Sequence, residues 1–454
     1  MEKEEKQSWV MTHIMPPMMK FLNTKAVTAI KNGMIYPVPF IIVGSVFLIL
    51  GQFPYQPIQD YLNEIKLGPL FLQINNASFG ITAILAVFGI AYVWVRNEGF
   101  EAAPAGMAAI ICHILLQPDT IKSVTNIADS SKVSTAWQVS GVIDRQWLSG
   151  KGIILSIIVG LLVGWIYTGL MRRKITIKMP EQVPENVAAS FTALVPAGII
   201  ITLTGIVHGI FTIGFNTTLV EQVYKLIQMP LQHVVDGPAG LFVIAFLPVF
   251  IWWFGVHGST IIGGIMGPLM FANNVDNLEL YKAHHLDLAH GAHIITQPFM
   301  DQYLTVTGAG MTIGFVIFML VRAKSAQMKT IGKLEIGPAL FNINEPILFG
   351  IPVVLNPMLA IPFILQPVLS GVLTYLVILA GIIPPLNGLP IPWTTPPIIS
   401  GLIVGGWKGM IWQILMLAMS VVVYWPFAVR YDKILLAQEA EVEAEIQEEK
   451  AAGK

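Results

Sequence analysis

Residues 361–383 read IPFILQPVLSGVLTYLVILAGII and contain no charged side chain. They belong to a longer uncharged run that extends from Pro346 to Trp407. Because a helix crosses the hydrocarbon core of a bilayer with about 20 mostly apolar residues, this stretch predicts a transmembrane helix. The composition agrees: 54% of the residues are hydrophobic and only 12% are charged, whereas soluble domains carry about 25% charged residues. The sequence therefore predicts an all-α polytopic membrane protein.

Other apolar stretches predict the remaining membrane helices. Two regions, 257–300 and 336–360, are broken by Gly, Pro, Asn and His and are too irregular to form plain spanning helices. Irregular backbone at membrane depth is tolerated only inside protein or around a cavity, so both regions are predicted to be re-entrant hairpins around a site. The predicted helices lie near 33–52, 77–96, 101–117, 152–172, 190–217, 237–256, 304–322, 361–383 and 398–426.

Lysines and arginines gather at one set of helix ends. Lys25 precedes the first predicted helix, Arg172 follows the fourth, and Arg430 follows the last. The positive-inside rule then predicts cytoplasmic N- and C-termini and a cytoplasmic loop at 322–335. Residues 1–32 are a predicted cytoplasmic N-terminal segment. Residues 431–454 are a predicted cytoplasmic charged tail, either a solvated helix or disordered.

One carboxylate interrupts the apolar sequence. Glu345, in the motif NINEP at 342–346, is the only charged residue between Ile336 and Trp407. A charge at membrane depth costs about 2.5–3.5 kcal/mol on insertion scales, and such residues commonly have a function. Pro346 favours an extended residue before it and predicts a helix break at Glu345. These features predict a substrate site; the alternative is a structural acid paired with a lysine or arginine.

A histidine is the second isolated polar group. His257 is the only titratable residue between Gly237 and Val275, and it follows Trp252 and Trp253 and precedes Gly258. Histidine can handle protons or phosphoryl groups near neutral pH, and a glycine lets backbone or ligand approach closely. Tryptophan faces stack on sugar rings. A neutral histidine inside a helix bundle and an interfacial aromatic belt are the alternatives.

A stiff loop carries a third candidate. Residues 390–397 read PIPWTTPP, and four prolines in eight residues exclude a regular helix. Trp393 is thereby held on an extended segment. It is suited either to an aromatic platform for a sugar or to an anchor at the membrane interface.

The net charge, the cysteine count and the remaining acidic and histidine residues argue against several classes of function and of site. A net charge of −1 gives no reason to expect nucleic acid, and the single cysteine, Cys112, excludes a disulfide within the chain. No pair of aspartates suited to a metal-dependent lipid-linked transferase lies in an apolar context. The histidines from His284 to His293 have spacings that zinc can use, but a solvated loop or a lining of the substrate pathway is preferred. We expect no metal and no cofactor.

Together these residues resemble a known family. His257 after the Trp252-Trp253 pair, then NINEP at 342–346, then PIPWTTPP at 390–397 are similar to the membrane subunit, IIC, of the bacterial sugar phosphotransferase system. The lactose, cellobiose and diacetylchitobiose branch is the most similar. The resemblance covers nearly the whole chain, from Met18 to near Tyr424.

The resemblance implies an architecture and a set of site residues. We expect a homodimer of ten-span protomers with two re-entrant hairpins in a bacterial cell membrane. Residues 33–235 would form the dimer scaffold and residues 236–430 would hold the sugar. Glu345 and His257 would act at the sugar hydroxyl that receives the phosphoryl group. The residues expected to line the sugar by resemblance are Asn344, Trp252 and Trp393, and those added from their places in the motifs are Asn342 and Gly258.

The resemblance also implies a second protein as phosphoryl donor. This is a small cytosolic IIB protein that carries phosphocysteine, so the chain would act as a phosphotransferase only together with IIB. The basic loop from Arg322 to Lys333 is either its docking surface or simple positive-inside charge. The preferred substrate is a β-linked disaccharide of the cellobiose or diacetylchitobiose class. The alternative function is a proton-coupled secondary sugar transporter in which Glu345 carries the proton on a discontinuous helix.

Overall fold

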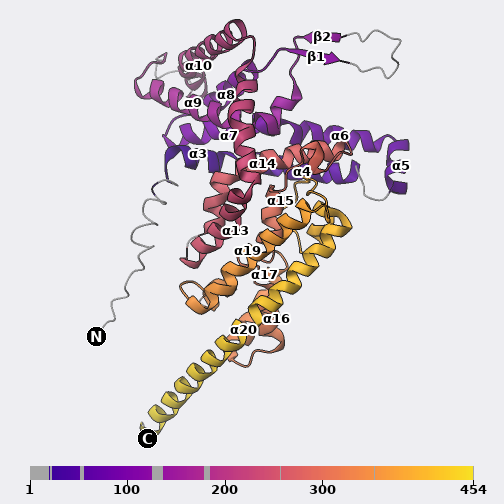
Figure 1. Ribbon diagram of the computed structural model, residues 1–454. Coiled ribbons are helices and arrows are strands. Elements are labelled where there is room, and N and C mark those ends of the chain that lie inside the picture. Colours follow the sequence, from indigo (N-terminus) through magenta and orange to yellow (C-terminus); the bar gives the residue numbers. More distant parts are fainter. Residues whose placement is uncertain are drawn as a thin grey trace. The chain divides into compact units, whose positions relative to one another are not determined.

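A computed structural model describes residues 20, 23–51, 56–124, 136–177, 185–255, 257–351 and 353–452 (Figure 1). Most of the predicted N-terminal segment, 1–32, therefore lies outside the described residues. The chain divides into two compact units, Met1–His233 and Val234–Lys454. The roles assigned to the halves 33–235 and 236–430 stay predictions.

The first unit is built mainly from helices. Its elements are α3 (Lys25–Gly33), α4 (Val38–Gly51), α5 (Gln56–Glu64), α6 (Leu67–Ser78), η1 (Phe79–Ile81), α7 (Thr82–Asn97), α8 (Ala103–Leu115), β1 (Thr120–Val124), β2 (Ala136–Ser140), η2 (Arg145–Leu148), η3 (Gly150–Gly152), α9 (Ile153–Arg172), α10 (Glu185–Gly209), η4 (Ile210–Gly214), α11 (Leu219–Val223), η5 (Tyr224–Gln228) and α12 (Met229–Asp236), which ends in the second unit.

Two strands correct the all-α prediction. β1 and β2 pair antiparallel, with Thr120 opposite Ser140, and lie side by side in Figure 1. They form the two-stranded sheet of the described residues. The helical class otherwise holds.

Glycines allow close helix packing in the first unit. A methyl group on Gly89 of α7 would lie 2.3 Å from the carbonyl oxygen of Gly33 in α3. A methyl group on Gly160 of α9 would lie 2.8 Å from Ile90 of α7. Membrane helices associate through such small residues because lipid provides no hydrophobic drive between them.

An acidic residue joins three helix ends of this unit. Glu98, just after α7, forms ion pairs with Lys25 at 2.5 Å and with Arg172. Lys25 begins α3 and Arg172 ends α9. The two basic residues that the sequence assigns to one side of the membrane therefore lie at one end of the unit.

The second unit is helical, with long irregular connections. Its elements are α13 (Pro238–Trp253), α14 (Gly258–Lys282), η6 (Leu288–His290), α15 (Gln297–Phe299), η7 (Met300–Leu304), α16 (Ile313–Val321), α17 (Ala326–Ala339), α18 (Glu345–Gly350), α19 (Pro357–Leu379) and α20 (Ile399–Ala452).

The continuous helix α14 corrects the prediction that 257–300 is broken by its Gly, Pro, Asn and His residues. It runs for 25 residues through Pro268, and irregular backbone begins only after Lys282. Asn277 explains why the loop beyond is ordered, since its amide donates to the carbonyl oxygens of His293 and Leu386. Packing thus keeps helical a stretch whose glycines and proline suggested a break.

A buried irregular segment replaces the start of the helix predicted at 304–322. α16 begins only at Ile313, because Thr307, Gly308 and Met311 have positive φ angles. Side chains satisfy the freed backbone groups: the Tyr424 hydroxyl donates to the Gly310 carbonyl oxygen at 2.8 Å. Irregular backbone is acceptable here because it is buried in protein.

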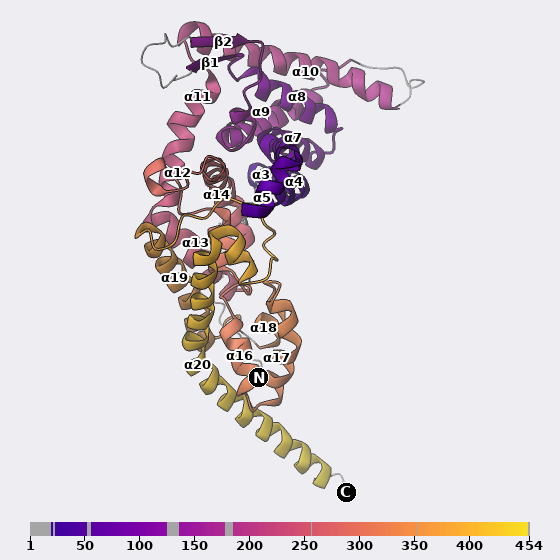
Figure 2. The same cartoon turned by 90° about the vertical axis from the view of Figure 1, so that its right-hand side faces the viewer.

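The α17–α18 hairpin lies beside α16 and α20 in Figure 2. The break expected in 336–360 is present between Ala339 and Glu345. Glu345 itself begins α18, so the break lies just before it. α20 consists of two helices joined across a kink at Gly406, whose backbone is non-helical, and the second continues beyond the predicted end at 426 to Ala452.

Five helices of the described residues are long and apolar enough to cross a membrane, or six if one bent pair counts as a span. The predicted number of about ten is therefore not confirmed. The five are Leu67–Asn97, Gly150–Arg172, Phe191–Gly214, Pro357–Leu379 and Ile399–Ala444, and the bent pair joins Leu219–Asp236 to Pro238–Trp253.

Candidate functional site

A cavity of about 240 Å³ in the second unit brings most predicted site residues together. Its walls come from the α13–α14 junction, from 297–309, from the start of α18 and from the 390–397 loop. Six of the seven candidates line it: Trp252, His257, Asn342, Asn344, Glu345 and Trp393.

Glu345 lies at the turn of the α17–α18 hairpin. It is the first residue of α18, is exposed, and lines the cavity. Pro346 occupies the next helical position, where the missing N–H would have no helical partner in any case. No ion pair of the described residues includes Glu345, which disfavours the alternative of a structural acid paired with a lysine or arginine.

His257 caps α14 and is held by its neighbours. Its Nδ1 accepts the N–H of Thr260 at 3.2 Å and lies 2.8 Å from the Thr260 hydroxyl. In the neutral ring, Nε2 therefore carries the proton and can donate to a ligand. Trp252 is 5% exposed and packs against the imidazole.

The two asparagines of NINEP bind backbone. Asn342 accepts the N–H of Thr307 at 2.6 Å and donates to the carbonyl oxygens of Trp393 and Thr395. Asn344 donates to the carbonyl oxygen of Ala309 at 2.6 Å. Both line the cavity, but their amides are engaged in joining the hairpin to two other segments.

Trp393 and Gly258 differ in their relation to the cavity. Trp393 is 54% exposed and lines it. Gly258 is not among the lining residues: a methyl group there would lie 1.9 Å from the carbonyl oxygen of Pro248. The glycine therefore allows α13 and α14 to approach closely.

Gln297 and Asp301 also line the cavity. The Gln297 amide donates to both Asp301 carboxyl oxygens at 3.0 Å. In the sequence, the feature that points to these two residues is their spacing of one helical turn, close to a proline.

The histidines of 284–293 lie in the irregular segment that follows α14. The described residues contain no group of three or more His, Cys, Asp or Glu side chains placed to hold a metal ion. His293 contacts Asp236 at 3.3 Å and Asp276 at 3.5 Å. Burial lowers the pKa of His293, but hydrogen bonds and charges from the two aspartates outweigh burial and raise it to about 9.

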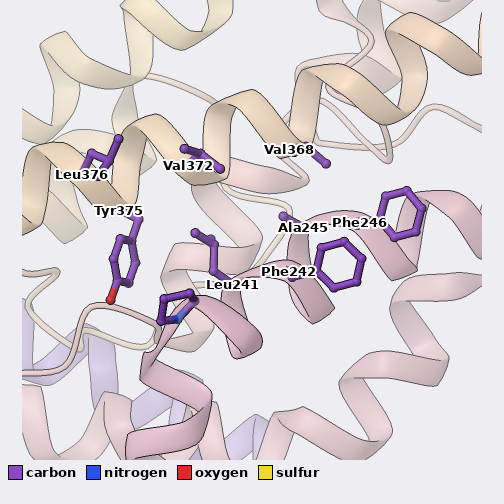
Figure 3. A pocket seen from close by; sticks show the side chains of 9 residues that line it. Leu241, Phe242, Ala245, Phe246, Val368, Val372, Tyr375 and Leu376 are labelled. Carbon is purple, nitrogen blue, oxygen red and sulfur yellow. The ribbon is translucent and has the colours of Figure 1, made fainter.

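An apolar cavity of about 340 Å³ lies between α13 and α19 (Figure 3). Leu241, Phe242 and Phe246 of α13 face Val368 and Val372 of α19. Tyr375 also lines the cavity, but its hydroxyl already donates to the carbonyl oxygen of Asp236, so the cavity offers few hydrogen bonds to a sugar. The cavity that contains Glu345 and His257 is therefore the better site for a polyhydroxylated ligand.

Comparison with known proteins identifies the family. The sequence model described as "Phosphotransferase system, EIIC" matches residues 31–367. The chain is 33% identical over 428 residues to the oligo-beta-mannoside-specific EIIC component of Bacillus subtilis, covering 92% of each chain. It is 33% identical over 432 residues to the cellobiose-specific EIIC component of Geobacillus stearothermophilus, covering 94% of each.

A solved structure is similar over almost the full length. The crystal structure of the transporter ChbC, the IIC component of the N,N'-diacetylchitobiose-specific phosphotransferase system, has a TM-score of 0.87 and 32% identity, covering 95% of this chain and 99% of that one. The predicted family is thereby confirmed. The chain belongs to the EIIC family of the phosphotransferase system, whose members are membrane permeases for sugars.

Proposed function

We propose that this EIIC permease imports a β-linked disaccharide of the cellobiose or diacetylchitobiose class and presents its C6 hydroxyl to phospho-IIB. The relatives named for cellobiose and N,N'-diacetylchitobiose support the sugar class. The observation that carries the proposal is one cavity lined by a carboxylate, an imidazole and two indoles: Glu345, His257, Trp252 and Trp393.

The cavity offers the groups that sugar recognition needs. The exposed face of Trp393 can stack on a pyranose ring, while Glu345 and Asp301 can accept hydrogen bonds from hydroxyls. In the proposal Asn342 and Asn344 place the hairpin and the tryptophan loop, because their amides are bound to backbone.

The proposed chemistry is a phosphoryl transfer from cysteine to oxygen. Glu345 accepts the proton of the C6 hydroxyl as a general base. The oxygen attacks phosphorus, the P–S bond of phospho-IIB breaks, and the thiolate leaves. His257 donates from Nε2 to the hydroxyl or to the phosphoryl oxygens and stabilises the developing charge.

We also propose that the protein is a homodimer with both termini in the cytoplasm. In the first unit, Glu98 forms ion pairs with Lys25 and Arg172, so these two basic helix ends lie at the same end of the unit. This arrangement supports the proposed orientation. In the second unit, the carboxylate of Asp432 accepts the N–H groups of Lys324 and Ser325, so the basic loop lies beside the 430–433 end of the last span. We propose this loop as the docking surface for IIB.

Vesicles that carry the protein, supplied with purified phospho-IIB and labelled disaccharides, test the function. Sugar phosphate formed without dependence on a proton gradient is the expected result. Cellobiose and diacetylchitobiose are expected to be better substrates than α-linked maltose. Accumulation of unmodified sugar that requires a proton gradient would instead support the secondary transporter and make Glu345 a proton carrier.

A further inference from the structure

A second acid of the α17–α18 hairpin is fully buried. Glu335 has 0% exposure and stands on the inner face of α17 with Met328, Gly332 and Ala339. The rest of this face is apolar, and Met328 and Ala339 belong to the main hydrophobic core of the unit. A carboxyl group in this position requires an explanation, because burying an unpaired charge is costly.

Glu335 has no hydrogen-bond or ion-pair partner in the described part of the chain. Both carboxyl oxygens are buried and neither receives a hydrogen bond of ordinary geometry. The N–H of Ile347 lies close and favours the charged form, but it does not reach such geometry. On its own helix, Lys329 and Lys333 are exposed and form no ion pair with it.

Among the described residues, a neighbouring helix places a negative charge near Glu335. Glu345 of α18 repels the charged form of Glu335. α16, which also packs on α17, has no titratable side chain between Ile313 and Val321.

The third neighbour, α20, offers no free cation to Glu335. It contributes the neutral hydroxyls of Tyr424 and Tyr431 to the same core. Its Asp432 is engaged by backbone N–H groups at the start of α17, as is Glu439. Its Arg430 and Lys433 are exposed.

We propose that Glu335 and Glu345 form an interacting pair of acids, in which Glu335 holds a proton at neutral pH. Removal of a carboxyl group from water favours its protonated form, and a second carboxyl group nearby favours it further. Glu335 is enclosed in apolar side chains, and this burial without a cationic partner favours its neutral form.

Glu335 is therefore a positioning residue. It does not line the sugar cavity, and it undergoes no covalent change. Its proton removes a buried negative charge from beside the proposed base. That consequence for catalysis rests on the proposed function, whereas the protonation state of Glu335 does not.

Infrared difference spectroscopy of the purified full-length protein tests the pair without sugar or IIB. The difference between wild type and Glu335→Gln at neutral pH is expected to contain the C=O stretch of a protonated carboxylic acid. Glu335→Met, which places an apolar side chain of similar length in the core, provides the same comparison if the glutamine variant folds poorly.

A titration of that band in the Glu345→Gln background tests the coupling. Removing the negative neighbour should lower the midpoint at which Glu335 loses its proton. Absence of a protonated acid in the wild type, or an unchanged midpoint in Glu345→Gln, would overturn the proposal.

Transfer assays then connect the pair to function. Glu335→Gln should retain transfer within about twofold at neutral pH, because it preserves a neutral side chain. At alkaline pH, where Glu335 of the wild type ionises, wild-type transfer should fall while the glutamine variant keeps its activity.

An equal decline of transfer in both proteins at alkaline pH would show that Glu335 does not affect the reaction, even if the infrared band were present. Absence of transfer in all proteins would contradict the proposed function and leave the spectroscopic result intact.

Discussion

The rings of Trp252 and His257 lie 4.6 Å apart, measured between centroids, at an angle of 50°. The buried indole supports the imidazole on one side, and Thr260 engages its Nδ1. His257 is therefore oriented by the protein before a ligand binds. In the described part of the chain no hydrogen bond occupies Nε2, which is the atom that the proposed reaction uses.

Replacing His257 by alanine, which has no side-chain donor, should impair transfer more than binding. Loss of one donor to a developing charge costs about 100- to 1000-fold in rate, whereas sugar affinity should stay within about tenfold because Trp252 and Trp393 remain. Transfer from phospho-IIB and equilibrium sugar binding measure the two effects. His290→Ala, on an exposed loop, is the matched control. Equal loss of binding and transfer would assign His257 to recognition alone.

Asn342 should affect the sugar through the tryptophan loop. Asn342→Asp keeps the oxygen that accepts the N–H of Thr307 but removes the donors to the carbonyl oxygens of Trp393 and Thr395. Losing about 1–1.5 kcal/mol from these bonds should weaken sugar binding about tenfold. Isothermal titration and Trp393 fluorescence are the measurements. Normal affinity would show that the loop keeps its position without Asn342.

Gly258 should be needed for folding. Alanine there would force α13 and α14 apart, since the new methyl group overlaps the Pro248 carbonyl oxygen. We expect a loss of about 1–3 kcal/mol of stability, the usual cost of overpacking. Thermal unfolding in detergent compares it with Gly263→Ala, a cavity-lining position of α14 where an added methyl group meets nothing within 4 Å. A stable Gly258→Ala protein with weak sugar binding would restore the predicted binding role.

The 283–296 loop should become less ordered as the pH rises into the alkaline range. His293 titrates near 6.5 when unfolded and has a pKa of about 9 beside Asp236 and Asp276. Because the folded pKa is the higher one, its stabilisation is complete below about pH 6.5 and disappears as pH rises through 9. Amide hydrogen exchange, corrected for intrinsic rates, should show falling protection of this loop over that range. His293→Gln should remove the pH dependence; an unchanged profile would exclude the histidine as its origin.

The site could be predicted from the sequence because its residues stand out in apolar stretches. The structure places Glu345, His257 and Trp393 around one cavity. The sequence could not predict which partners they have, because those contacts join distant segments. Asn342, for example, binds backbone 35 and 51 residues away. For the same reason α14 was predicted to be broken and α16 to begin too early: glycines and prolines signal irregular backbone, but tertiary packing decides where it occurs.

Glu345→Gln is the most direct test of the account. In vesicles with phospho-IIB, the variant should bind disaccharide with near-normal affinity and lose transfer by at least about 100-fold, because the amide cannot accept the hydroxyl proton. Glu345→Asp should recover part of the activity. Normal phosphorylation of sugar by Glu345→Gln would contradict the assignment of Glu345 as the base.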